Sequence, residues 1–341
     1  MKTMKSKFYS LALAAGMLTL TACSDDNTND SNNDKGNGIE NGSTLKGTIT
    51  EDVTLKAGNT YKLSGEYIVE AGATLNIEEG VKIISIYDNI VDYILVKQGA
   101  KINAVGTPDK PIVMTSEKEE PGAWGGIHIC GKAHTNAEGG KGSSEIGGAV
   151  YGGNDDADNS GTLQYIRLEY TGFAFDEEHE ANGISFYGVG NGTIVDHCEA
   201  YKGSDDGFEF FGGSVNVSNM VVVSCSDDSF DWTEGWNGKG TDLVAYQEAK
   251  ATLGYDCDCL IEADNNENDN AATPVSHPVL KNLILAGNGE SKQGIRLRRG
   301  TQADIDNAKV CGKGQPLVVE SALTNAALKN GTSKLTNMTV T

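Results

Sequence analysis

The chain has 341 residues and a formal net charge of −21, with 48 acidic and 27 basic side chains. Such an acidic surface repels nucleic acid and anionic lipid, so we expect no nucleic-acid partner, and a polyanionic substrate would need a bridging cation or a local basic patch. Hydrophobic residues make up 38% of the chain, which is enough for a sizeable core.

The first 22 residues have the pattern of a secretory signal peptide. Lys2, Lys5 and Lys7 precede an apolar run over residues 8–20, and small residues follow that run. The run is too short to span a bilayer comfortably, and the whole arrangement is typical of a cleaved export signal.

The end of this segment, Leu20-Thr21-Ala22-Cys23, resembles the lipobox of bacterial lipoproteins. The resemblance implies cleavage before Cys23 and acylation of its thiol and amine, with palmitate as one such acyl group. The acidic Ser24-Asp25-Asp26 resembles the export signal with which some Gram-negative lineages place lipoproteins on the outer face. We therefore expect a lipid anchor in the outer membrane and a protein that faces the cell exterior. An ordinary signal peptide with a chance cysteine is the alternative.

Residues 23–44 are expected to form a flexible tether, and residues 45–341 a single folded domain. Ser, Asp, Asn, Gly and Thr dominate the tether, which cannot bury apolar area. From residue 45 onward, short apolar-alternating runs of strand length recur between Gly and Asn residues, without sustained helical periodicity. Examples are Val53-x-Leu55, Tyr61-x-Leu63, Leu75-x-Ile77 and Val81-x-Ile83.

A repeat is visible further along the chain. Gly183-Ile184-Ser185-Phe186, Gly207-Phe208-Glu209-Phe210 and Ser229-Phe230-Asp231-Trp232 align at steps of 24 and 22 residues, and Asp205-Asp206 recurs as Asp227-Asp228. A period in the low twenties suits one coil of a solenoid. We predict an all-β fold, a right-handed parallel β-helix, in which the apolar members of each motif stack inside the coil. The interleaved side chains should point outward: Ser185, Glu209, Asp231 and Arg296.

Two segments, near residues 134–160 and 247–275, do not fit the repeat. Both are predicted to be long loops that project from the coil, where β-helix proteins often build sites; plain surface insertions are the alternative. Cys257 and Cys259 could staple the second loop, while Cys198 and Cys225 lie in apolar runs and are expected in the core. No Cys or His spacing indicates zinc.

Several longer strings are specific enough to carry a family resemblance. They are Tyr151-Gly152-Gly153-Asn154-Asp155-Asp156, Tyr165-Ile166-Arg167-Leu168-Glu169-Tyr170, Gly203-Ser204-Asp205-Asp206-Gly207 and Asp227-Asp228-Ser229-Phe230-Asp231-Trp232. Between about residues 124 and 247 the chain is thereby similar to a bacterial family of extracellular right-handed parallel β-helix repeat lipoproteins of unestablished activity. The resemblance implies a fold and a location, and it implies no particular activity.

The repeat places six carboxylates on two neighbouring coils: Asp205, Asp206, Glu209, Asp227, Asp228 and Asp231. Equivalent members should stack roughly 5 Å apart, which is unfavourable unless something compensates. One carboxylate could hold a proton, a hard cation such as Ca²⁺ could bind among the oxygens, or Arg296 or Arg298 could reach over from a later coil. A purely structural ladder of aspartates that cap backbone N–H groups at the turns is a further alternative.

Ser204-Asp205-Asp206, Asp227-Asp228 and Arg296-Leu297-Arg298 partly resemble the strings of polygalacturonase-type β-helix hydrolases. The chain lacks the Gly-His-Gly of those enzymes, and its only later histidine, His277, precedes a proline. Calcium-dependent pectate lyases offer a second resemblance, which implies carboxylates around Ca²⁺ and an arginine such as Arg296 as base. Whether this protein is an enzyme stays open.

The candidate catalytic residues are therefore Asp206, Asp228 and Arg296. Asp205, Glu209, Asp231 and Trp236 are candidates for substrate binding, and the candidate Ca²⁺ ligands are Asp205, Asp206, Asp227 and Asp228. Trp236 is a candidate exposed platform for a sugar ring, with a loop anchor as the alternative. Weaker aromatic candidates are Tyr187 and Tyr246, and His128 is expected on the surface.

The functional hypothesis is a cell-surface lipoprotein whose β-helix engages an extracellular glycan, with Ca²⁺ as the cofactor and cleavage of the glycan left open. The alternative is a non-catalytic surface or adhesion scaffold in which the acidic ladder only stabilises the coil.

Overall fold

The computed structural model describes residues 38–88, 90–175, 180–290 and 292–341. The predicted signal peptide, the acylated Cys23 and most of the expected tether lie outside these residues. Within the described part of the chain, no helix is long and apolar enough to cross a membrane.

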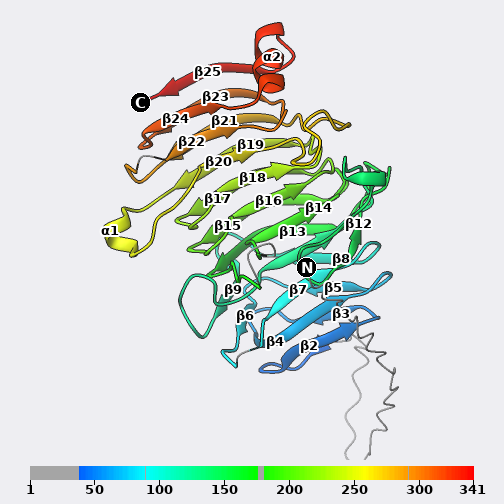
Figure 1. The fold of residues 1–341 in the computed structure, drawn as a ribbon. Coiled ribbons are helices and arrows are strands. Elements are labelled where there is room, and N and C mark those ends of the chain that lie inside the picture. Colours follow the sequence, from blue (N-terminus) through cyan, green and yellow to red (C-terminus); the bar gives the residue numbers. More distant parts are fainter. Residues whose placement is uncertain (1–37, 89, 176–179, 291) are drawn as a thin grey trace, which may run out of the picture. The chain divides into compact units, whose positions relative to one another are not determined.

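The described chain winds as a right-handed parallel β-helix, which confirms the predicted fold (Figure 1). Each coil passes through three parallel sheets, which we call sheets I, II and III in chain order. Sheet I continues from the second half of β4 (Thr60–Val69) through later strands. These are β7 (Tyr93–Val96), β10 (Ile127–Cys130), β14 (Ile184–Tyr187), β16 (Phe208–Phe211), β18 (Phe230–Thr233), β20 (Ile261–Ala263), β22 (Gln293–Leu297) and β24 (Gln315–Val319).

In the first coils, separate short strands build sheets II and III. Sheet II starts with β1 (Gly38–Ile39), β3 (Val53–Leu55), β5 (Thr74–Ile77) and β8 (Lys101–Val105). Sheet III contains β6 (Lys82–Ser85) and β9 (Ile112–Ser116), while β2 (Thr44–Ile49) and β4 each run from sheet III into sheet I.

In the later coils, one longer strand serves both sheets, because its first half pairs in sheet II and its second half in sheet III. These strands are β13 (Gly161–Glu169), β15 (Ile194–Tyr201), β17 (Asn216–Val223), β19 (Lys239–Tyr246), β21 (Val279–Ala286), β23 (Asp304–Cys311) and β25 (Lys334–Val340). The helix α2 (Ala322–Asn330) lies between β24 and β25.

A left-handed residue marks the corner at which each long strand turns from sheet II to sheet III, and in β17, β21, β23 and β25 that residue is asparagine. Asn219, Asn282, Asn307 and Asn337 have φ values of +53°, +59°, +58° and +52°. Asparagine tolerates this left-handed conformation better than most residues. The amides also bond along the stack, since Asn307 Nδ2 donates to Asn282 Oδ1 at 2.9 Å. The same turn is therefore repeated from coil to coil.

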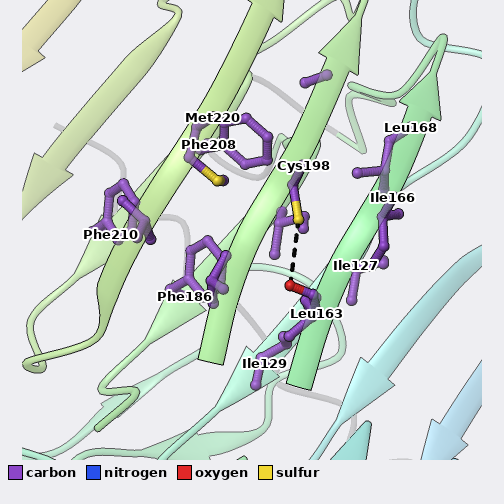
Figure 2. Close-up of a cluster of buried hydrophobic side chains, with 14 of the residues drawn as sticks. Ile127, Ile129, Leu163, Ile166, Leu168, Phe186, Cys198, Phe208, Phe210 and Met220 are labelled. Atoms are coloured by element: carbon purple, nitrogen blue, oxygen red, sulfur yellow. Dashed lines mark hydrogen bonds between the residues drawn. The ribbon is translucent and has the colours of Figure 1, made fainter. Parts of the chain in front are cut away.

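The core follows the predicted register. Phe186 of β14 pairs with Phe210 of β16, and Phe210 pairs in turn with Trp232 of β18; the rings of Phe186 and Phe210 stack at 5.1 Å. Figure 2 shows the phenylalanines of sheet I facing Cys198 and Met220 from the long strands, all buried. The expected burial of the aromatic motif residues is confirmed, as is that of Cys198.

The insertion at residues 134–160 leaves the coil between β10 and β13, at the corner from sheet I to sheet II. It contains the short 3-10 helix η1 (Glu138–Gly140) and an antiparallel pair, β11 (Gly142–Ser143) and β12 (Val150–Tyr151). This insertion folds back over the outward face of sheet I, where Ile146 and Tyr151 pack with Tyr187 and Phe211 in a second apolar cluster.

The second predicted loop is not a single loop. Its residues 261–263 form β20, which pairs with β18 and β22 in sheet I. The segment before β20 projects at the corner from sheet III to sheet I and contains α1 (Lys250–Leu253), while the segment after it projects at the corner from sheet I to sheet II. Cys257 and Cys259 are buried free thiols rather than partners in a staple. Both the 134–160 insertion and residues 264–275 thus project at the corner from sheet I to sheet II, in different coils.

Candidate functional site

Asp206 and Asp228, which we call the ladder carboxylates, lie just before β16 and β18 and hold successive coils together. Asn182 Oδ1 accepts from the backbone N–H of Asp206 at 3.2 Å, and Asp206 Oδ1 accepts from that of Asp228 at 2.8 Å. Asp228 Oδ1 accepts from the N–H of Cys259 at 2.6 Å. Side chains that bond in this way satisfy backbone donors that the turn would leave unpaired.

The ladder carboxylates are nearly inaccessible, with 5% of Asp206 and 4% of Asp228 exposed. Burial raises the pKa of both groups well above the usual range, and the charges of neighbouring aspartates raise it further. The sequence correctly predicted that they stack in successive coils. Their place inside the corner gives them a structural task, whatever further role they have.

Asp205 and Asp227 form the neighbouring stack at the same corner, where Asp205 is buried and Asp227 is exposed. One oxygen of each, together with one of Asp206, lies within 4.8 Å of the others. Burial and then the charge of Asp227 raise the pKa of Asp205 well above its usual range. Three carboxylates this close could hold a hard cation, for which carboxylate oxygens are the preferred ligands.

Glu209 and Asp231, which we call the cleft carboxylates, point outward from adjacent positions of β16 and β18, as predicted. Together with Asp206 they form another group of oxygens within 4.8 Å of one another. Glu209 accepts from Asn182 Nδ2 at 2.6 Å, whereas Oδ1 of Asp231 is buried and has no hydrogen-bond partner among the described residues. Burial raises the pKa of both cleft carboxylates well above the usual range.

The two candidate arginines are occupied by other acidic residues. Arg296 donates to Glu262 at 2.8 Å and to Glu320 at 3.1 Å, and among the described residues it makes no hydrogen bond with Asp206 or Asp228. Arg298 pairs with Glu262 and donates to Asp264 at 2.7 Å. The charge of Arg298 lowers the pKa of Asp231, but burial dominates and the pKa stays raised.

Trp236 does not present a sugar platform, and that prediction is wrong. Only 1% of the residue is exposed, its ring stacks on Phe210 at 4.1 Å, and Nε1 donates to the carbonyl of Val215 at 3.2 Å. The turn at Gly235 carries the indole into the core, so the loop-anchor alternative holds.

The 134–160 insertion explains why two further residues are buried although the sequence predicted them to be exposed. His128 and Tyr187 point outward from sheet I, but residues 134–160 cover that face and both side chains are fully buried. Burial lowers the pKa of His128 to about 4, so it is neutral at physiological pH. Tyr246 is the one member of this predicted group that is exposed, at 51%.

A cleft of about 290 Å³ lies on the outward face of sheet I, beside the 134–160 insertion. The cleft carboxylates form its floor together with Phe211 and Thr233. The 134–160 insertion contributes Glu145 and Tyr151 to one wall. The remaining lining comes from Glu234 and from later segments: Asp264, Asn266, Glu267, Asn268, Arg298 and Arg299. Asp206 and Trp236 do not line this cleft, and Glu145, Glu234 and Glu267 are site candidates that the sequence analysis missed.

Hydrogen bonds tie the walls of the cleft together. Asn136 Nδ2 donates to Asn265 Oδ1 at 2.8 Å, and Asn266 Nδ2 donates back to Asn136 Oδ1 at 3.0 Å, so the two projecting segments are joined directly. Glu234 has a left-handed backbone, with φ of +54°, and accepts 2.7 Å bonds from Tyr151 and Thr135. The site is therefore built before any ligand arrives, which lowers the cost of binding.

Residues 47–341 match the model of a family described as the pectate-lyase like beta helix domain. No curated protein and no solved structure matches the chain. The family match covers nearly all of the described coil, including the cleft and both projecting segments.

Proposed function

The chain belongs to the pectate-lyase-like beta-helix domain family, and we propose that it binds an extracellular glycan in the acidic cleft over sheet I. Membership of the family supports a carbohydrate-related function. The observation that carries the proposal for this site is the cleft itself, because it is pre-formed and its convergent polar groups have raised pKa values, which is typical of functional sites.

We also propose that Ca²⁺ binds at the corner next to the cleft. Asp205, Asp206 and Asp227 offer oxygens within 4.8 Å of one another, and the exposed Asp227 leaves a path from solvent. A divalent cation would relieve the repulsion that raises the pKa of Asp205. Asp228, a fourth predicted ligand, lies outside this group and serves the ladder.

The location is also a proposal. The signal-like residues 1–22 and the lipobox cysteine Cys23 support a lipid-anchored protein on the outer face of the outer membrane. From there, the cleft would meet polysaccharide outside the cell.

A second candidate function is a non-catalytic surface or adhesion scaffold. The bonds from the ladder carboxylates to backbone N–H groups favour it, because they give the acidic repeat a structural reason to exist. On this alternative the cleft binds no sugar, and a cation at the corner only stabilises the coil.

Glycan binding is tested by passing the purified protein over a panel of immobilised polysaccharides, with product release measured on the same samples. We expect retention on at least one polysaccharide and its loss in Asp231→Asn. Asp242→Asn, which changes an exposed aspartate at the corner between sheets II and III, is the matched control. Retention of nothing on the panel would favour the scaffold.

Calcium binding is tested by the thermal midpoint in Ca²⁺ and in EDTA. We expect a higher midpoint in Ca²⁺, because a ligand that binds only the folded state stabilises it. The difference should shrink in Asp227→Asn and persist in Asp242→Asn. An identical midpoint in Ca²⁺ and EDTA for the unchanged protein would remove calcium from the proposal.

A further inference from the structure

The charge of the cleft lining is strongly one-sided. Its acidic members are Glu145, Glu209, Asp231, Glu234, Asp264 and Glu267, and its basic members are Arg298 and Arg299. No lysine or histidine lines it among the described residues. A ligand therefore meets carboxylate on the floor and on both walls.

Both arginines of the lining are already paired with carboxylates. Arg298 is held by Glu262 and Asp264, while Arg299 Nη1 lies 2.9 Å from Asp264 and 3.6 Å from Glu267. Recognition of a sugar acid needs a free guanidinium or ammonium, which makes the paired bonds that such carboxylates prefer. In the described cleft, carboxylates of the protein already offset the positive charges that could meet a sugar acid, although the name of the family refers to an acidic polysaccharide.

The floor has an unused acceptor instead. Oδ1 of Asp231 is buried without a hydrogen-bond partner, and the residue lines the cleft. Leaving a buried acceptor unpaired is costly, and for a charged group the cost is larger. A ligand that brings an N–H donor and a positive charge to this carboxyl group would stabilise its ionised form.

The shape of the cleft fits a sugar that carries such a group. Phe211 and Tyr151 line it beside Asp231, so a ring could lay its C–H face on aromatic carbon while its polar edge meets the carboxylates. At about 290 Å³ the cleft is near the lower end of the size range of small-ligand pockets, which suits a short part of a glycan chain.

We propose that the cleft selects a saccharide with a free amine, a hexosamine unit whose ammonium lies against Asp231 and Glu209, and that it rejects uronates. The inference rests on the proposed function, since it names the class of glycan for the same site. The corner group around Asp227 is the proposed place for Ca²⁺ and adjoins the cleft carboxylates through Asp206; we expect amine binding without added metal.

Isothermal titration of the purified full-length protein with three oligosaccharides of equal length tests this inference. The probes are a glucosamine oligomer, its fully N-acetylated counterpart and an oligogalacturonate, each in EDTA and in Ca²⁺ at a pH at which the amine is protonated. We expect the glucosamine oligomer to bind about tenfold or more tightly than the acetylated one in both buffers. Oligogalacturonate should not bind in EDTA.

The variant Asp231→Asn keeps the size of the side chain and removes its ability to ionise. It should abolish the preference for the free amine, while Asp242→Asn should retain it. High salt should weaken the glucosamine complex more than any complex of the acetylated oligomer, because only the former contains a charge pair. An unchanged preference in Asp231→Asn would overturn the assignment to this atom.

The remaining outcomes separate this inference from the proposed function. Equal affinity for the amine and acetylated probes, or tightest binding of oligogalacturonate, would overturn amine selection and leave glycan binding intact. Absence of binding to all three probes would overturn amine selection as well, and the polysaccharide panel then decides whether the cleft binds any glycan.

Discussion

The ladder carboxylates Asp206 and Asp228 and the cleft carboxylates Glu209 and Asp231 occupy the same two coils, three residues apart, yet they differ in what surrounds them. The ladder oxygens accept from the backbone N–H groups of the next coil, at 2.8 and 2.6 Å. The cleft carboxylates point outward from strands whose N–H groups are already used in the sheet. An acidic repeat in a solenoid can therefore serve structure at one position and ligand binding at the next, and the available donors decide which.

The largest expected effect comes from breaking the ladder. Asp228→Ala removes the acceptor of the Cys259 N–H and leaves this buried donor unpaired, which should lower the free energy of unfolding by about 2–3 kcal/mol. Urea denaturation would measure it. The corresponding change in the cleft, Asp231→Ala, should leave stability unchanged or higher, because its buried oxygen has no partner to lose.

A conservative variant separates hydrogen bonding from charge in this experiment. Asp228→Asn retains an oxygen acceptor, so it should recover most of the stability that Asp228→Ala loses. If Asp231→Ala is the more destabilising of the two alanine variants, the division of the carboxylates into two tasks is wrong.

The second effect is a pH dependence of stability in EDTA. Burial holds the pKa of Asp231 above its value in the unfolded chain, which is about 3.9. The folded state then binds a proton that the unfolded state releases, so this contribution is complete below about pH 4 and is lost as the pH rises through the folded pKa.

The expected result is a free energy of unfolding that falls as the pH rises above about 4, with a shallower fall in Asp231→Asn because the side chain of that variant does not titrate. Denaturant titrations at several pH values provide the measurement. Parallel curves for the two proteins would show that Asp231 is ionised in the folded state over the whole range.

The smallest effect concerns the wall of the cleft. Tyr151→Phe removes a hydroxyl that donates to Glu234 at 2.7 Å, but Thr135 still donates to the same oxygen. We expect a loss of about 1 kcal/mol in ligand affinity, roughly fivefold, with little change in the thermal midpoint. If Tyr151→Phe lost as much ligand affinity as Asp231→Asn, the main binding contact would lie on the wall of the cleft and not on its floor.

Local repetition made the coil predictable. The steps of 22 and 24 residues and the alternation in Phe208-Glu209-Phe210 predicted the register of sheet I and the stacking of both carboxylate pairs, because each depends on neighbours one coil away. The three-residue strand β20 escaped detection, since Ile261-Glu262-Ala263 is too short to show a pattern inside a polar segment.

The burial of sheet I by the 134–160 insertion and the formation of the cleft depend on long-range contacts, which a local sequence pattern does not predict. His128 and Tyr187 alternate outward as expected, but a segment folded back over sheet I buries them. Glu145 and Glu267 reach the cleft from non-repeating segments, and the reciprocal bonds of Asn136 and Asn266 join parts of the chain that are 130 residues apart. Trp236 was misplaced because the direction of a side chain at a glycine turn depends on backbone geometry, not on composition.

The corner between sheets I and II has a consequence for how such proteins diversify. The chain leaves there after β10 and resumes pairing at Gly161 opposite Ile102, so an excursion of any length returns to the same register. Doubling the length of a flexible loop costs only about 0.6 kcal/mol of closure entropy. Evolution can therefore exchange the walls of the cleft while the coil beneath them is inherited unchanged, and a protein engineer can graft new walls at the same two junctions.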